Sequence, residues 1–526
     1  MRKKLLFGAG FLCLSAALYW GYVKTFRSSS IDMASLSSVH LDRLIRSDVL
    51  ETLTALQTYI ENPNEFTLAS CASDISYLQS LTMRLRPEDM NLSSIKRDHA
   101  EIVRKSFFVR QALKNRLNGF AKDISVAKLR NHPCTSAARN GMRILRYIDD
   151  YILTTVLNPK PFDPKKDKKA GSILNDKAPL LITVDRGPVK LRSGDLIMSR
   201  GNAYTSAAIS RIGVEEAQFS HLAQIYIEAP AGTEVTIEQA LKDPRVHTVE
   251  AHIEIGSFTR SFAKYAEDGN ARAAQFRFRG SAADAHKAAK SIFTYVQKYQ
   301  AKKMKEAHRT RLSVNDNPPY DFKMDGNDHS EIFCAEIVSM GYANAGTKLP
   351  TFPTILKKNE LTEKMGIAVS SAFAPADMEI EPHFVQLAEW RDLRQIPSVM
   401  KKDVALSSMF RWMAERKYSF QTKSIDLIKA MLAWTARQTD LGFKERLPKN
   451  MDQKVIRLTF AIDRTGALLE EELEKFETQQ SLGGRKLRPI FWEQMAYLEK
   501  FRKEDAAAFR KNPLFRNSSL HGGFRP

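Results

Sequence analysis

The segment SHLAQIYIEA, residues 220–229, is rich in β-branched and aromatic side chains and has the two-residue period of a strand. Four other segments share this character and are bounded by Gly, Pro or Asp: LLITV (180–184), GDLIMSR (194–200), HTVEAHIEI (247–255) and AAQFRFRG (273–280). We expect them to form one antiparallel sheet. The residues that follow predict a long helix over 281–307 and a short helix over 331–340 that ends at Gly341. This combination predicts an α+β fold.

Helical regions flank the predicted sheet. Over residues 31–160, apolar side chains recur at intervals of three and four, as in Leu41, Ile45, Val49, Leu53, Leu56 and Ile60. A Pro- and Lys-rich stretch over 161–179 predicts a linker, so the sheet-containing domain is expected over 180–395. Helices are expected again over 396–526, ending in a basic tail that we expect to be solvated and partly disordered.

The N-terminus, residues 1–30, predicts a membrane anchor. Three cations at positions 2–4 precede an uncharged run over residues 5–23, which as a helix would measure about 28 Å, close to the thickness of a bilayer core. The basic end favours a single-pass inner-membrane protein with the bulk of the chain facing the periplasm. A cleaved signal peptide is the alternative interpretation.

Composition narrows the class of partner. The chain has 526 residues and a formal charge of +20, which favours anionic surfaces such as phospholipid, cell-wall polymer or nucleic acid. A protein exported from the cytoplasm rarely meets nucleic acid, so we expect no nucleic-acid partner. Hydrophobic residues make up 43% and charged residues 27%, which excludes wholesale disorder and a multispan membrane protein. Sequence does not predict the oligomeric state.

The cysteines also fit an oxidising compartment. Cys71 and Cys134 both lie in the N-terminal helical region and are the candidates for a disulfide, which would contribute about 4 kcal/mol. The alternative is two separately buried free cysteines. Cys334 is then left as an odd thiol.

Three residues have types suited to nucleophilic catalysis. Cys334 lies near the start of a predicted helix, where free N–H groups and the helix dipole favour thiolate over thiol. His221 opens a predicted strand, which would aim its ring to one side as a general base requires. Glu250 lies in the next strand, where its carboxylate could orient the imidazole.

The ordered motifs resemble the YiiX-like cysteine hydrolases, the circularly permuted branch of the NlpC-type papain-like superfamily. The motifs are Gly194-Asp195-Leu196, Ser220-His221, Glu250-Ala251, Tyr320-Asp321 and Cys334-Ala335-Glu336. The resemblance covers residues 180–395 and implies a permuted papain-like core, an antiparallel sheet with a nucleophile helix. It implies Cys334 as nucleophile, His221 as base and Glu250 as orienting residue, without a cofactor or a metal.

Several roles stay open at this stage. His252 lies on the same strand face as Glu250 and is the alternative third catalytic residue, although we favour Glu250. Tyr320 could line the pocket, while Asp195 and Asp321 are expected as turn or cap residues. A zinc site of His221, His252 and Cys334 fits by residue type but lacks a closely spaced ligand pair.

The predicted function is a membrane-anchored cell-envelope cysteine hydrolase or acyltransferase. It would cleave an amide or ester bond in a cell-wall peptide or a lipid through a Cys-His-Glu triad. The alternative is a catalytically inactive envelope scaffold with a papain-like fold. The presence of Cys334, His221 and a carboxylate favours the enzyme.

Overall fold

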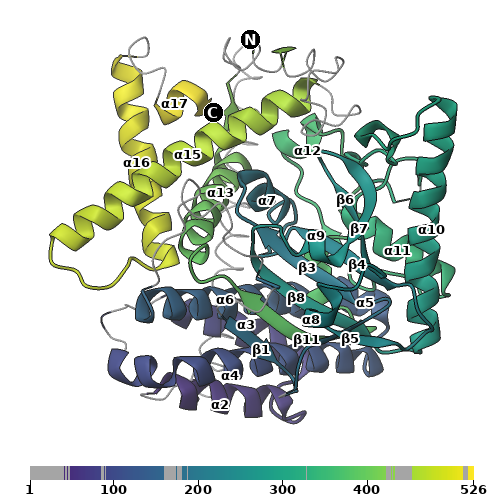
Figure 1. Ribbon diagram of the computed structural model, residues 1–526. Coiled ribbons are helices and arrows are strands. Elements are labelled where there is room, and N and C mark those ends of the chain that lie inside the picture. Colours follow the sequence, from purple (N-terminus) through teal and green to yellow (C-terminus); the bar gives the residue numbers. More distant parts are fainter. Residues whose placement is uncertain are drawn as a thin grey trace, which may run out of the picture.

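The computed structural model describes most of the chain. The described residues are 48–83, 91–158, 180–185, 187–326, 328–421, 453–512 and 519–526, with isolated positions at 41, 44, 88, 173, 174, 428, 431 and 432. Within them, the protein is an α+β structure built on a seven-stranded antiparallel sheet (Figure 1). The predicted α+β class and antiparallel sheet are therefore confirmed.

The sheet has the strand order β1-β11-β8-β3-β4-β6-β7. The strands are β1 (Leu180–Thr183), β3 (Leu196–Gly201), β4 (His221–Ile227), β6 (Val246–His252), β7 (Gly256–Ser261), β8 (Asn270–Phe278) and β11 (Phe384–Arg391). All the paired strands run antiparallel. The five segments predicted as strands all contribute to this sheet, and β7 and β11 were not among the predictions.

Two helices pack against β4, β6 and β7 on one face of the sheet. They are α10 (Ala282–Glu306) and α11 (Cys334–Asn344). Both predicted helices exist, but the predicted end of the second at Gly341 is wrong, because α11 begins at Cys334 and continues through Gly341 to Asn344. Ala288 and Ile292 of α10 and Ile337 of α11 join strand residues such as Leu222 in one buried cluster. Gly194 lets α10 approach the sheet, because a Cβ there would lie 2.6 Å from the Cβ of Ala285. This close packing fixes α11, which carries Cys334 on its first residue.

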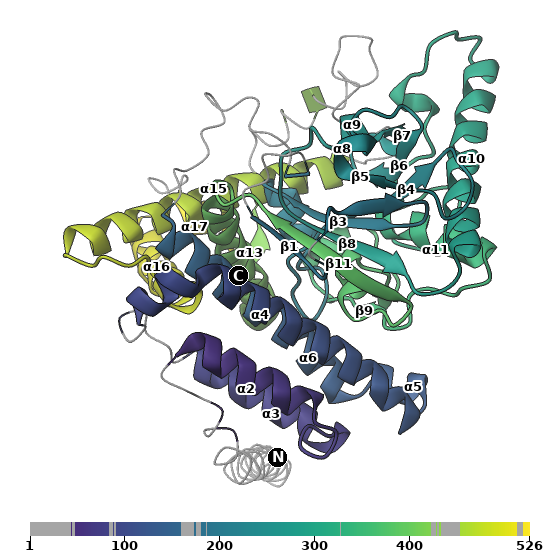
Figure 2. The same cartoon turned by 60° about the horizontal axis from the view of Figure 1, so that its bottom comes forward.

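The N-terminal helices form a bundle on the side of β1 and β11 (Figure 2). They are α2 (Val49–Glu61), α3 (Leu68–Thr82), α4 (Leu92–Gly119), α5 (Val126–Arg130) and α6 (Pro133–Val156). Asp48 caps α2 by accepting hydrogen bonds from the backbone N–H groups of Leu50 and Glu51. A disulfide joins Cys71 of α3 to Cys134 of α6, as predicted from the sequence.

The bundle is joined to the sheet by buried ion pairs. Glu389 of β11 is fully buried and accepts from Arg110 of α4 (3.0 Å) and Arg146 of α6 (3.2 Å). Arg391, two residues along β11, contacts both Glu389 (2.8 Å) and Asp149 of α6 (3.1 Å). Each buried carboxylate is thus shared by several guanidinium groups, and helix and strand are held in one register.

The C-terminal helices pack against α6, α7 (Tyr204–Ile209) and β8, with α15 and α16 in yellow in Figure 1. They are α13 (Ile396–Arg416), α15 (Gln453–Leu482), α16 (Phe491–Lys511) and α17 (Leu520–Gly523). The expectation of a solvated, partly disordered tail is wrong for the described residues. Leu498, Leu520 and Phe524 are buried with α13, and Phe524 pairs with Phe420 in a short sheet. Burial of these apolar side chains outweighs the net positive charge of the segment.

The predicted membrane span, residues 5–23, lies outside the described residues. Among those that the structure describes, no helix is both long enough and apolar enough to cross a bilayer. The longest, α15, carries three consecutive glutamates at 470–472. This finding goes against a single-pass inner-membrane protein with its bulk in the periplasm, and we do not retain that prediction.

Glu389→Gln should destabilise the fold strongly. The substitution removes the charge that compensates Arg110, Arg146 and Arg391, and breaking a buried ion pair costs roughly 3–5 kcal/mol. Urea denaturation followed by circular dichroism should show this loss in the free energy of unfolding. Glu471→Gln, which removes a carboxylate paired with Lys475 at the surface, is the matched control and should leave the transition unchanged. Equal midpoints for both variants would contradict the role of the network.

Candidate active site

The three residues predicted to act together are brought together. His221 is the first residue of β4, Glu250 lies near the end of β6, and Cys334 is the first residue of α11. Since β4 and β6 pair with Gln224 opposite Val249, the same register places His221 opposite His252. His221 forms a hydrogen bond with Glu250, and Cys334 lies close enough to raise the pKa of His221. A Cys-His-Glu chain of contacts therefore exists at the ends of these strands.

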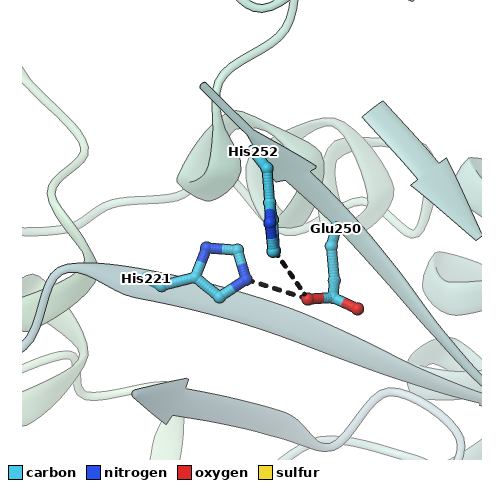
Figure 3. A group of neighbouring side chains, drawn as sticks. All are labelled: His221, Glu250 and His252. Atoms are coloured by element: carbon cyan, nitrogen blue, oxygen red, sulfur yellow. Dashed lines mark hydrogen bonds and ion pairs between the residues drawn. The ribbon is translucent and has the colours of Figure 1, made fainter. Parts of the chain in front are cut away.

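Glu250 holds both histidines (Figure 3). Its Oε2 atom lies 3.0 Å from Nε2 of His221 and 3.1 Å from Nε2 of His252. The two rings meet edge to face, with centroids 4.6 Å apart. Nε2 of His221 hydrogen-bonds with Glu250, so Nδ1 is the ring nitrogen available for the thiol of Cys334. The choice of Glu250 as orienting residue agrees with this geometry, and His252 is a second partner of the same carboxylate.

Arg260 secures the Glu250 carboxylate from the other side. Its Nε donates to Oε1 (2.8 Å) and its Nη2 to Oε2 (3.0 Å), while Thr248 also donates to Oε1 (2.6 Å). Burial would raise the pKa of Glu250, but hydrogen bonds from His221 and His252 and the charge of Arg260 bring this pKa well below 4.5. The carboxylate is thus a fixed negative charge behind both imidazoles.

Both histidines respond to that charge. Burial acts to lower the pKa of His221, yet its hydrogen bonds with Cys334 and Glu250 raise this pKa above 6.5. Burial likewise acts to lower the pKa of His252. The hydrogen bond and the charge of Glu250 nevertheless raise this pKa above its ordinary value. The imidazolium forms are therefore favoured, as a base that must hold the thiol proton requires.

Tyr320 is buried next to Cys334. Burial and the neighbouring charges, that of Cys334 first, raise the pKa of Tyr320 well above 10, and its hydroxyl hydrogen-bonds with Cys334. Its ring packs against Phe322, with centroids 5.2 Å apart. The phenol is therefore protonated and adjacent to the sulfur.

Asp195 and Asp321 have structural roles, as expected. Asp195 accepts from the backbone N–H of Arg192 (2.9 Å) and pairs with Arg277 (2.8 Å). Asp321 accepts from the backbone N–H of Lys323 at 2.7 Å, in a turn. These contacts account for both oxygens of Asp195 and for Oδ1 of Asp321.

Glu336 and Arg260 are site residues that sequence reasoning missed. Glu336 accepts from the backbone N–H of Phe333 (3.2 Å) and contacts Nδ1 of His329 (2.8 Å), so it fixes the first turn of the helix that begins at Cys334. Burial, and then the charges of nearby aspartates, raise the pKa of Glu336 to about 8. The motif Cys-x-Glu was a visible signal for it. Arg260 lies in β7, which was not among the predicted strands, so the sequence held no signal for it.

The His-Glu-His group could also hold a metal ion. The ligand atoms of His221, Glu250 and His252 all lie within 4.8 Å of one another. The sequence spacing did not reveal this, because the grouping depends on the pairing of β4 with β6. Arg260 already occupies both oxygens of Glu250, and a guanidinium there repels a second cation. The arrangement favours proton transfer at the two imidazoles over metal binding.

Searches against protein-family models, curated proteins and solved structures found no match to this chain. The site is therefore interpreted from its own geometry.

Glu250→Gln should lower the pKa of both His221 and His252, because the neutral amide removes the charge that stabilises each imidazolium. Titration of selectively labelled histidines by NMR measures both values. In linkage terms, the two raised pKa values stabilise the native state below about pH 6.5, and that stability is lost as pH rises through the native values. Glu228→Gln, which removes the carboxylate beside His247, is the control and should leave both titrations unchanged. Unshifted titrations in Glu250→Gln would contradict the assigned electrostatics.

Proposed function

We propose that this protein is a cysteine hydrolase or acyltransferase that cleaves an amide or ester bond through Cys334, His221 and Glu250. The observation that supports it most is the continuous chain of contacts from the thiol through His221 to the buried Glu250 carboxylate. Geometry of this kind is what activates a thiol for acyl transfer. The core resembles a permuted papain-like fold in its motif order, and that assignment is part of the proposal.

The reaction would proceed in two steps. His221 takes the thiol proton at Nδ1, and the sulfur of Cys334 attacks the carbonyl carbon to form a tetrahedral intermediate. His221 then returns the proton to the leaving amine or alcohol as the intermediate collapses to a thioester. Water or another acceptor, deprotonated by His221, attacks the thioester and releases the acyl group and the thiol.

The oxyanion would be stabilised at the start of α11. Cys334 is the first helical residue, so its backbone N–H has no carbonyl partner one turn back within the helix. The Tyr320 hydroxyl, which contacts the sulfur, is placed to donate a second hydrogen bond. Glu250 stays ionised throughout and holds the imidazole tautomer.

The substrate would be a cell-wall peptide or a lipid, and the resemblance favours a lipid. Purified protein should be incubated separately with cell-wall peptide fragments and with total lipid, and the products compared by mass spectrometry. Cys334→Ala should abolish product formation, and His221→Ala should reduce turnover by at least about 1,000-fold. Glu250→Gln should reduce it less, because the base remains. His247→Ala, a histidine on the same strand as Glu250 but outside the site, is the matched control.

A second prediction needs no substrate. Cys334 is the free cysteine of the described residues, and its side chain is buried. If the site opens to reagents, iodoacetamide should label Cys334 faster in the wild type than in His221→Ala, which lacks the base. Cys71 and Cys134 should label only after reduction. Peptide mass mapping at mildly acidic pH measures each rate. A folded protein with neither Cys334-dependent products nor a reactive Cys334 would favour the inactive scaffold.

A further inference from the structure

A second carboxylate lies behind the candidate site, on the far side of Arg260. Asp268 follows α9 (Phe262–Tyr265) and precedes β8, and its side chain is 33% exposed. Nη1 of Arg260 donates to Oδ1 of Asp268 at 3.0 Å, and Nη2 donates to Oδ2. The guanidinium is therefore shared between two carboxylates, Glu250 in the site and Asp268 nearer the surface.

These two carboxylates fix the direction of the guanidinium. Nε and Nη2 of Arg260 donate to Glu250, whereas Nη1 and Nη2 donate to Asp268. A planar guanidinium that makes a paired contact on each side loses hydrogen bonds if it turns about its last bond. Asp268 therefore limits the angle at which Arg260 meets Glu250.

Two aromatic rings also contact the guanidinium. Its Cζ atom lies 5.4 Å from the ring centre of Phe258 and 5.2 Å from that of Tyr265. The attraction between a cation and a ring face depends little on rotation of the cation about the contact. The rings thus keep Arg260 in place, and the two carboxylates set the direction in which its N–H groups point.

The backbone holds Asp268 in turn. Its N–H donates to the carbonyl of Tyr265 at 3.1 Å, and its carbonyl accepts from the N–H of Asn270 at 2.8 Å. Asn270 is the first residue of β8, which pairs with β3 in the central sheet. Asp268 is therefore anchored to rigid elements on both sides, as a residue that orients another requires.

We infer that Asp268 is a positioning residue for the proposed reaction and acts through Arg260 on the Glu250 carboxylate. One oxygen of Glu250 accepts from both His221 and His252, and this arrangement depends on the direction of the carboxylate. Loss of Asp268 would let the guanidinium turn and take Glu250 with it. The inference rests on the proposed function, and it extends the chain of contacts behind Cys334 to a partly exposed residue.

Asp268→Asn in the full-length protein tests the inference. Turnover should show a kcat at least about tenfold lower with KM unchanged, because the variant disturbs the alignment of the catalytic groups and touches no substrate. The pKa values of His252 and His221, followed by NMR, should both fall. A negative charge near the imidazoles is lost, and the charge of Arg260, which already acts to lower the pKa of His252, is then less compensated.

Glu267→Gln is the matched control. This neighbouring carboxylate is exposed and pairs with Lys264, so its loss should change neither turnover nor the histidine titrations. Asp268→Glu keeps the charge and should keep both pKa values, but its longer side chain should displace the guanidinium and lower kcat at least about threefold. That variant keeps the test valid if Asp268→Asn does not fold, which thermal unfolding would show.

The outcomes separate this inference from the proposed function. Absence of Cys334-dependent products in the wild type would contradict the proposed function itself. Products in the wild type, together with wild-type kcat in both Asp268 variants, would overturn the inference. A lowered kcat in Asp268→Asn with unshifted histidine titrations would also overturn it, because the loss would then be a general effect on the fold.

Discussion

The buried pairing of Glu389 with Arg110, Arg146 and Arg391 is the constraint on which the rest of the structure depends. Desolvating these charges is costly, and the cost is offset only when every partner is in place. Because the partners come from α4, α6 and β11, the N-terminal bundle is able to dock on the sheet in one register only. Packing of apolar side chains alone would allow more than one arrangement.

Further buried ion pairs join the strands next to the candidate active site to the surrounding helices. Arg272 of β8 pairs with Asp150 of α6, and Arg200 of β3 pairs with Asp403 of α13 (3.0 Å). β3 in turn pairs with β4, and Ser199 lies opposite His221. The strand that presents the candidate base is thus positioned through hydrogen-bonded neighbours that the ion pairs fix. Positioning on rigid elements is what a catalytic constellation needs.

At the site itself, one carboxylate accepts hydrogen bonds from two imidazoles and one guanidinium. Glu250 is fully buried, and its charge is retained because Arg260, His221 and His252 all donate to it. Removing any one donor changes the electrostatic environment of the other two, so these residues form a single unit. The unit explains why the pKa values of both histidines rise although burial acts in the opposite direction.

Local sequence patterns were sufficient to predict the α+β class, five of the strands and a short helix near Cys334, because periodicity and turn residues act over a few positions. The Cys71–Cys134 pair was one of two alternatives for these cysteines, and the tertiary structure decided between them. Motif order also indicated His221, Glu250 and Cys334. Only the tertiary structure decided that Arg260 donates to Glu250, since this contact depends on the register of β6 and β7. The ordered C-terminal helices were likewise decided by packing between distant segments, which no local pattern records.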